Sequence, residues 1–219
     1  MPYHSYVFFD AEPSIHGVSR TKLTTAKKEF AARISKAKKD VRTQAYATLG
    51  FKAGTRFALN FNAATPEVIQ TLLRELLHSS LGAHLRIAHT LFGMTRSSQY
   101  NPSRPPKEAD WNLEHRYLVV YPFTKTIEWH LMPYEERRNV MKSHVDVGHK
   151  HSEKISQRLL YSYGIDDHEF IVSYHMNDLE AFVQLVMDMR STESRRHTKN
   201  DLPIFICIHM PLGEALDMV

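Results

Sequence analysis

The sequence contains a single cysteine, Cys207, so a disulfide within the chain is excluded. Cys207 lies in the apolar run PIFICIHM, where it is better interpreted as a core residue than as a redox group. No segment approaches the roughly 20 apolar residues of a membrane span. The N-terminus also lacks the basic start and apolar stretch of a secretory signal. We therefore expect a cytoplasmic chain with no membrane partner.

The sequence also lacks a strong excess of one charge. Its 28 Lys and Arg residues stand against 24 Asp and Glu, a formal net charge of +4, and the basic residues are spread along the chain. The early lysines fall within one amphipathic stretch, which favours a solvated helix face. We therefore expect no nucleic-acid partner. The 42% hydrophobic content is typical of a globular protein with a sizeable core.

Hydrophobic periodicity and turn residues predict the same order of elements twice. In the first half we expect strands at about 3–9, 42–49, 55–61 and 83–94, and helices at about 21–40 and 65–80. Residues 96–112 are polar and contain three prolines, which is typical of a connection. In the second half we expect strands at about 113–121, 154–162, 168–176 and 203–210, and helices opening near Pro133 and near Asn177 or Asp178.

Each half therefore has the order β-α-β-β-α-β of a ferredoxin-like unit. We predict an α+β fold of two fused ferredoxin-like halves, of the dimeric α+β barrel type. The expected parts are an N-terminal half at 1–98, a connecting segment at 99–112 and a C-terminal half at 113–219. Such halves can pack sheet against sheet or close into a barrel, and inward-facing residues would line any pocket.

The stretch MKSHVDVGHKH, at 141–151, contains three histidines. His144 and His151 would share a helix face, whereas His149 falls between turns. Zinc would require two or three close ligands, and no nearby Cys pair or HExxH pattern supports it. A haem requires only one proximal imidazole with the opposite face open, although a lone histidine is a weak signal of that.

Several linked motifs surround these histidines. The stretches YPFTKTIEWHLMPYEERRNVMKSHVDVGHKH, YSYGIDDHEFIVSYHMNDLEAFVQLVMDMRSTESRRHT and DLPIF follow TLFGMTRSSQY of the first half. Together they resemble the chlorite dismutase superfamily, and more closely its coproheme decarboxylase branch, the peroxide-dependent haem synthases. The resemblance covers mainly 86–210 and is strongest at 121–205. It implies that the C-terminal half carries a haem or coproheme pocket.

The resemblance gives His144 the role of proximal iron ligand, after the PxEER helix start at Pro133, and leaves His149 and His151 off the iron. It also assigns Gln157, thirteen positions further on, to the opposite side of the porphyrin. Chlorite-degrading relatives have an arginine there, whereas the decarboxylases have a neutral glutamine. Arg158 is adjacent, but neighbouring residues of a strand point to opposite faces.

Tyr121 and Lys125 form a Y-x-x-x-K pair whose even separation lets both reach one face of a strand. A phenol beside a peroxide-oxidised cofactor can supply an electron and a proton, and a nearby lysine can hold an anion or move that proton. The resemblance implies that Tyr121 becomes the radical that attacks a coproheme propionate, assisted by Lys125. Trp129 aligns with a family tryptophan near the site. Without the resemblance, Tyr121 and Trp129 would be interpreted as core aromatics.

Arg190 matches a family arginine near the propionates, and a guanidinium pairs well with a carboxylate. A cation favoured at a helix C-terminus explains it equally well. Two positions depart from the family pattern. His168 stands where many decarboxylases have tryptophan, and Arg195 replaces a serine that contacts the substrate.

The resemblance thus implies a haem-binding oxidoreductase that uses hydrogen peroxide to decarboxylate coproheme III to haem b. Its catalytic residues would be Tyr121, Lys125 and Gln157, with His144, Trp129 and Arg190 binding the iron porphyrin. Relatives form rings, so a homo-oligomer, often a pentamer, is expected. Two alternatives remain: a haem peroxidase or chlorite dismutase-like enzyme, and a non-enzymatic haem or coproheme carrier or sensor in which Tyr121 only packs.

Overall fold

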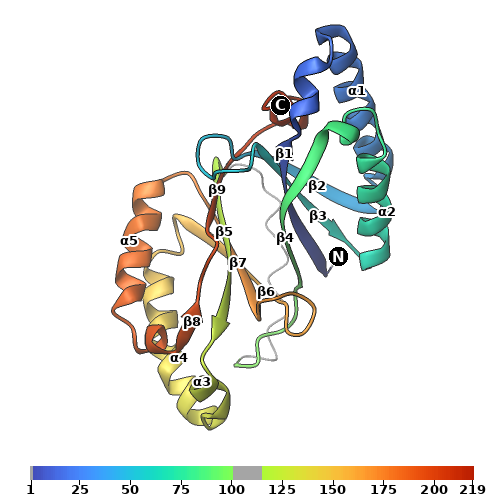
Figure 1. Ribbon diagram of the computed structural model, residues 1–219. Coiled ribbons are helices and arrows are strands. Elements are labelled where there is room, and N and C mark those ends of the chain that lie inside the picture. Colours follow the sequence, from blue (N-terminus) through green and yellow to red (C-terminus); the bar gives the residue numbers. More distant parts are fainter. Residues whose placement is uncertain (1, 101–114) are drawn as a thin grey trace. The chain divides into compact units, whose positions relative to one another are not determined.

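A computed structural model describes residues 2–100 and 115–219 of the chain (Figure 1). Its contacts divide the chain into two compact units, the first within 1–94 and 205–219 and the second within 95–204. Most of the expected connecting segment, 99–112, and the start of the strand expected at 113–121 lie outside the described residues. Each unit is described separately below.

The first unit contains the predicted βαββαβ order. Its elements are β1 (Tyr3–Ala11), α1 (Arg20–Ala37), β2 (Val41–Ala47), β3 (Phe57–Ala63), α2 (Pro66–Leu77) and β4 (Leu85–Met94), with short 3-10 helices η1 (Pro13–Gly17) and η2 (Gly82–His84). The strands lie in the order β4-β1-β3-β2, and each pairs antiparallel with its neighbours. This is the ferredoxin-like arrangement.

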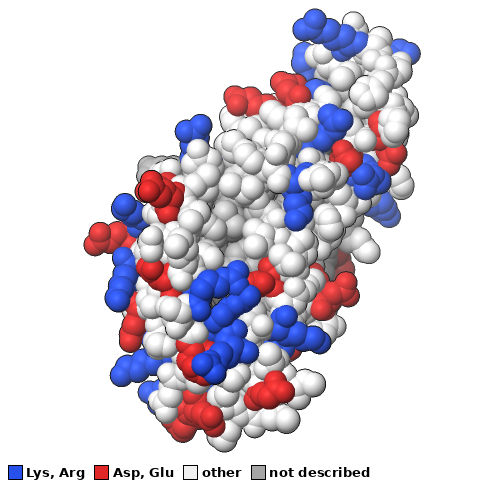
Figure 2. Space-filling model, turned by 60° about the vertical axis from the view of Figure 1, so that its left-hand side comes forward, with Lys and Arg blue, Asp and Glu red and all other residues white. Residues whose placement is uncertain are grey.

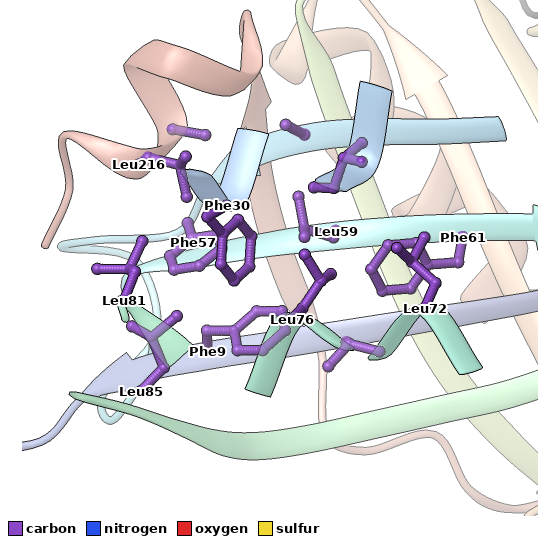
Figure 3. Close-up of a cluster of buried hydrophobic side chains, with 14 of the residues drawn as sticks. Phe9, Phe30, Phe57, Leu59, Phe61, Leu72, Leu76, Leu81, Leu85 and Leu216 are labelled. Atoms are coloured by element: carbon purple, nitrogen blue, oxygen red, sulfur yellow. The ribbon is translucent and has the colours of Figure 1, made fainter. Parts of the chain in front are cut away.

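Successive side chains of a strand point to opposite faces of the sheet, and this explains where the core of the first unit lies. Phe9 on β1 and Leu59 on β3 point into the cluster of buried side chains shown in Figure 3. Val7, which pairs with Leu59, belongs to the same cluster. The helices contribute residues at helical spacing, and the main ones are Phe30, Ile34, Ile69, Leu72 and Leu76. Ser19 caps α1 by accepting a hydrogen bond from the amide of Lys22.

The C-terminal segment joins this first unit. Strand β9 (Phe205–His209) pairs with β2 through Tyr46 and Ala47, and the short helix α6 (Leu212–Leu216) places Ala215 and Leu216 in the core. The sequence predicted the strand at 203–210 but assigned it to the second half. An apolar run predicts a buried strand without indicating which sheet it joins.

The second unit repeats the fold. It contains β5 (Tyr117–Lys125), α3 (Ile127–Leu131), α4 (Tyr134–Lys150), β6 (Ile155–Tyr161), β7 (Phe170–Met176), α5 (Leu179–Arg190), η3 (Glu193–His197) and β8 (Thr198–Asn200). Its strands lie in the order β6-β7-β5-β8, each pair antiparallel. Asp178 caps α5 by accepting from the amides of Glu180 and Ala181. Both units are therefore ferredoxin-like, and the α+β prediction is confirmed.

The hydropathy of the helices and the placement of the charged side chains are two further features of the fold. None of the described helices is long and apolar enough to cross a membrane. Figure 2 shows both basic and acidic side chains on the visible face, with several basic side chains gathered at its lower centre.

Candidate functional site

The second unit brings two of the predicted site residues, Gln157 and Tyr121, to one face of its sheet. Gln157 of β6 lies opposite Tyr174 of β7, which lies opposite Val119 of β5. Tyr121 stands two residues further along β5, so it belongs to the same face. The ring of Phe182, on α5, packs 5.2 Å from that of Tyr174, so α5 lies against this face. Gln157 is nevertheless exposed, which leaves part of the face uncovered.

Arg158 belongs to the opposite face. It lies opposite Ser173 rather than Tyr174 in the register of β6 and β7, and it is buried. The expectation that Gln157 and Arg158 point to opposite faces of the sheet is therefore confirmed.

Tyr121 forms a pair with Tyr174. Their ring centroids are 6.1 Å apart, and a side-chain hydrogen bond between them affects the pKa of both phenols. Burial raises the pKa of the Tyr121 phenol, and the bond with Tyr174 opposes that shift. Tyr174 is more deeply buried, which raises its pKa further. Tyr121 is thus an enclosed, protonated phenol with one polar neighbour on its own sheet.

Lys125 ends β5, just after an irregularity in its pairing with β8. Its Nζ lies 4.4 Å from the ring centre of Trp129 and donates to the carbonyl oxygen of Ser194 at 3.4 Å. Burial lowers the pKa of Lys125 to about 8, and the charge of Glu169 opposes this shift. Trp129 itself is buried on α3, where Thr126 caps the helix. Lys125 and Trp129 therefore belong to one cluster.

His144, on α4, completes this cluster. Its Nδ1 lies 2.9 Å from the hydroxyl of Ser194, the residue whose carbonyl accepts from Lys125. Burial lowers the pKa of His144 to about 4, and the positive charge of Lys125 contributes to the same shift. The imidazole is therefore neutral at physiological pH, as a metal ligand must be. Ser194 occupies Nδ1, so Nε2 is the nitrogen available to iron.

Two arginines near Tyr121, Arg190 and Arg195, pair with the same carboxylate. Arg195 Nη1 lies 2.7 Å and Arg190 Nη2 lies 3.3 Å from the same oxygen of Asp201. The charges of all three groups act on the Tyr121 phenol, and that of Arg195 also acts on Lys125. Arg190 therefore has a carboxylate partner besides its helix C-terminus. Two guanidinium groups beside a phenol are suited to receive a further carboxylate.

His149, His151 and His168 have environments different from that of His144. His149 is exposed, whereas Nε2 of His151 pairs with Asp188 at 2.9 Å and so connects α4 to α5. Nδ1 of His168 lies 3.7 Å from Asp166. Among the described residues, no group of His, Cys, Asp and Glu side chains is arranged to hold a metal ion. A porphyrin iron would not require such a group, because it takes only one ligand from the protein.

A donor set of one neutral imidazole, an exposed amide on a sheet face and nearby guanidinium groups fits an iron porphyrin with carboxylate substituents. Sequence reasoning missed three of the neighbours. Tyr174 resembled an ordinary strand aromatic, and Ser194 and Asp201 resembled polar turn residues. No local pattern distinguishes them, since their proximity to His144, Tyr121 and Arg195 arises from the fold.

A family model described as chlorite dismutase matches residues 23–210. The chain belongs to the chlorite dismutase family. The resemblance inferred from the motifs is confirmed at this level, and the matched range includes the whole second unit, most of the first and all the site residues named above.

Individual relatives carry two different names. A coproheme decarboxylase from Mycolicibacterium smegmatis is 26% identical over 161 residues, which cover 73% of this chain and 69% of the relative. A chlorite dismutase from Ideonella dechloratans is 22% identical over 213 residues, which cover 93% of this chain and 75% of the relative. The structure of a chlorite dismutase from Candidatus Nitrospira defluvii in complex with imidazole superposes with a TM-score of 0.90 at 21% identity, covering 99% of this chain and 94% of that one. This last likeness shows the fold.

Proposed function

We propose that this protein decarboxylates an iron porphyrin, converting coproheme III to haem b with hydrogen peroxide. The observation that carries the proposal is the combination of Gln157, rather than Arg158, on the face of Tyr121 with the neutral His144. A neutral amide at this position does not hold an oxyanion as a guanidinium does, which argues against chlorite as the main substrate.

The protein's own groups have distinct roles in this proposal. Nε2 of His144 binds the iron. Lys125 and Trp129 pack against each other in the same cluster as His144. Arg190 and Arg195 hold substrate carboxylates near Tyr121. When bound, the iron porphyrin supplies the oxidising power that it takes from peroxide. Tyr121 then gives up an electron and its phenol proton, and its radical takes a hydrogen atom from a propionate.

The overall change balances for each propionate. The side chain loses hydrogen and carbon dioxide to leave a vinyl group, and it gives up two electrons. One molecule of hydrogen peroxide accepts these electrons with two protons and leaves as two waters. The protein mainly positions the propionate against the phenol, because a radical step requires the reacting atoms in contact. Two such rounds complete the conversion.

The proposal has a direct test. Coproheme and then peroxide are added to the purified protein, and the product mass is followed for two successive losses of carbon dioxide. We expect haem b from the native chain and unreacted coproheme from Tyr121→Phe, which keeps the ring but loses the hydroxyl. Conversion by Tyr121→Phe at the native rate would refute the radical role, and no mass change in the native chain would refute the reaction.

The alternative activities leave different signatures in the same preparation. Release of oxygen from chlorite together with stable binding of haem b would favour a chlorite dismutase-like enzyme. Bleaching of the porphyrin by peroxide without loss of carbon dioxide would favour a carrier or sensor. We further propose that the chain acts in the cytoplasm and forms a homo-oligomer, with a pentameric ring as the expected form. Light scattering after size-exclusion chromatography measures the mass of the oligomer.

A further inference from the structure

Two hydroxyl groups beside His144 form a chain whose protons can be counted. The Thr192 hydroxyl donates to the carbonyl oxygen of Met189 at 2.7 Å. A threonine hydroxyl carries one proton, so this bond uses it. The Thr192 oxygen also lies 3.2 Å from the Ser194 hydroxyl oxygen. This distance is longer than that of most hydrogen bonds between hydroxyls, and because the Thr192 proton is used elsewhere, only Ser194 can donate across it.

The count continues to the imidazole. The single proton of the Ser194 hydroxyl is committed to Thr192, yet the Ser194 oxygen lies 2.9 Å from Nδ1 of His144. With the Ser194 proton directed to Thr192, the proton of this last contact belongs to the ring, whereas a Ser194 proton directed to Nδ1 would make the ring the acceptor. Thr192 and Ser194 are both buried, so water does not readily replace either partner. The amide of Arg195 donates to the Thr192 carbonyl at 3.1 Å and holds the two residues in one turn.

We propose that Thr192 and Ser194 act as a hydroxyl relay that fixes His144 in the Nδ1–H tautomer and so directs the lone pair of Nε2 to the iron. The proton path runs from His144 to Ser194, from Ser194 to Thr192 and from Thr192 to the Met189 carbonyl. Neither hydroxyl contacts the iron porphyrin in this assignment. Both are positioning residues that act through His144.

The relay also sets how strongly His144 donates to iron. A carboxylate that accepts from Nδ1–H would pull the proton away from the ring and increase its basicity. A serine hydroxyl is a neutral acceptor and does so only weakly. This consequence rests on the proposed function, because it requires His144 to bind iron. The tautomer itself does not rest on it and is measurable in the protein without porphyrin.

The sharpest variant is Thr192→Val, which keeps the shape of the side chain and removes its hydroxyl. Ser194 then loses its acceptor, and its proton becomes free to donate to Nδ1 of His144. We expect His144 to shift to the Nε2–H tautomer, although the altered residue does not touch it. Thr192→Ser restores the hydroxyl and should restore the native tautomer. Ser191→Ala, which removes an exposed hydroxyl bonded to Asp188 in the same turn, is the matched control.

The measurement is nitrogen NMR of the full-length chain labelled at histidine, without porphyrin, with His144 assigned from its missing signals in His144→Ala. The native chain, Thr192→Ser and Ser191→Ala should show a protonated Nδ1 and a bare Nε2, and Thr192→Val the reverse. A protonated Nε2 in the native chain would overturn the relay. Retention of the Nδ1–H form in Thr192→Val with a native circular dichroism spectrum would overturn it as well.

Coproheme titration, followed by absorbance, separates the relay from the proposed function. Thr192→Val should bind coproheme about 10- to 100-fold more weakly than the native chain, the usual effect of losing an outer partner of a metal-binding histidine. If the tautomer shifts and the affinity does not change, the relay stands and His144 is not the iron ligand. If the tautomer does not shift, the relay fails whatever the affinity.

Discussion

Tyr121 and Tyr174 lie on neighbouring strands of the second unit with their ring centroids 6.1 Å apart and their planes inclined by 27°. They are diagonal neighbours, because Tyr121 is opposite Val172 and Tyr174 is opposite Val119. Their side-chain hydrogen bond lowers the pKa of Tyr121 against the effect of burial. The proposed radical site thus has a buried partner that controls how easily its proton leaves.

Tyr174→Phe removes this partner while keeping the ring. The hydrogen bond with Tyr174 opposes the burial that raises the pKa of Tyr121, so its loss should raise that pKa further. We expect decarboxylation about two- to tenfold slower, the size of one hydrogen bond, because the phenol releases its proton less readily. Carbon-13 NMR of labelled tyrosine measures the pKa, and single-turnover mass spectrometry measures the rate. A rate equal to that of the native chain would exclude a role for the pair.

Lys125 predicts a pH dependence. Burial lowers its pKa from 10.5 to about 8, so its ammonium group loses its proton as the pH rises through that value. If the cation holds a substrate carboxylate, kcat/KM for coproheme should fall above pH about 8, because this parameter reports groups of the free enzyme. Lys125→Arg keeps a cation and should remove the fall. The kcat/KM of Lys125→Gln should be low and should not change with pH. A native rate that increases above pH 8 would indicate a base instead.

The main elements could be predicted from the sequence because their apolar residues recur at strand or helix spacing. Helix α5 is an example, with Leu179, Phe182 and Leu185 at helical intervals and Asp178 as its cap. The short elements α3, α6 and β8 were missed because three to five residues carry no periodicity. The membership of β9 was missed for another reason, since the choice of sheet depends on contacts distant in sequence.

The site divides in the same way. His144, Gln157, Tyr121 and Lys125 could be proposed as site residues from the sequence because family motifs surround them. Their partners Ser194 and Asp201 could not, because TESRRHTKND has the composition of an ordinary polar turn. Only the folded chain brings Ser194 to within 2.9 Å of His144, fifty positions away. Residues that contact a proposed site residue only through the fold are thus harder to recognise in the sequence than residues that lie within a family motif.

Asp201 should compete with the substrate for its two arginines. Its carboxylate pairs with Arg195 and Arg190, the groups proposed to receive propionates. Asp201→Asn removes the charge with little change in shape. We expect coproheme to bind about two- to fivefold more tightly, as for the release of partly exposed ion pairs. Haem b, which has fewer carboxylates, is the matched ligand, and its affinity should change less on the Asp201→Asn substitution. Weaker binding of coproheme would mean that Asp201 orients the arginines instead.

Gln157 offers the clearest test of how the two named activities of the family diverge. It is exposed on the face that it shares with Tyr174, so a larger side chain fits there without repacking a core. Gln157→Arg would add a guanidinium able to hold an oxyanion. We expect this variant, loaded with haem b, to release oxygen from chlorite at least about tenfold faster than the native chain, a difference of about 1.4 kcal/mol in barrier.

Gln157→Leu is the control for this change, because it alters the site without adding charge and should release no more oxygen than the native chain. An oxygen electrode records the rates, and the absorbance of bound haem b confirms equal loading. Equal rates in Gln157→Arg and Gln157→Leu would show that charge at this position does not decide the chemistry. Arg158 could not substitute for the added guanidinium, since it lies on the opposite face of the same strand.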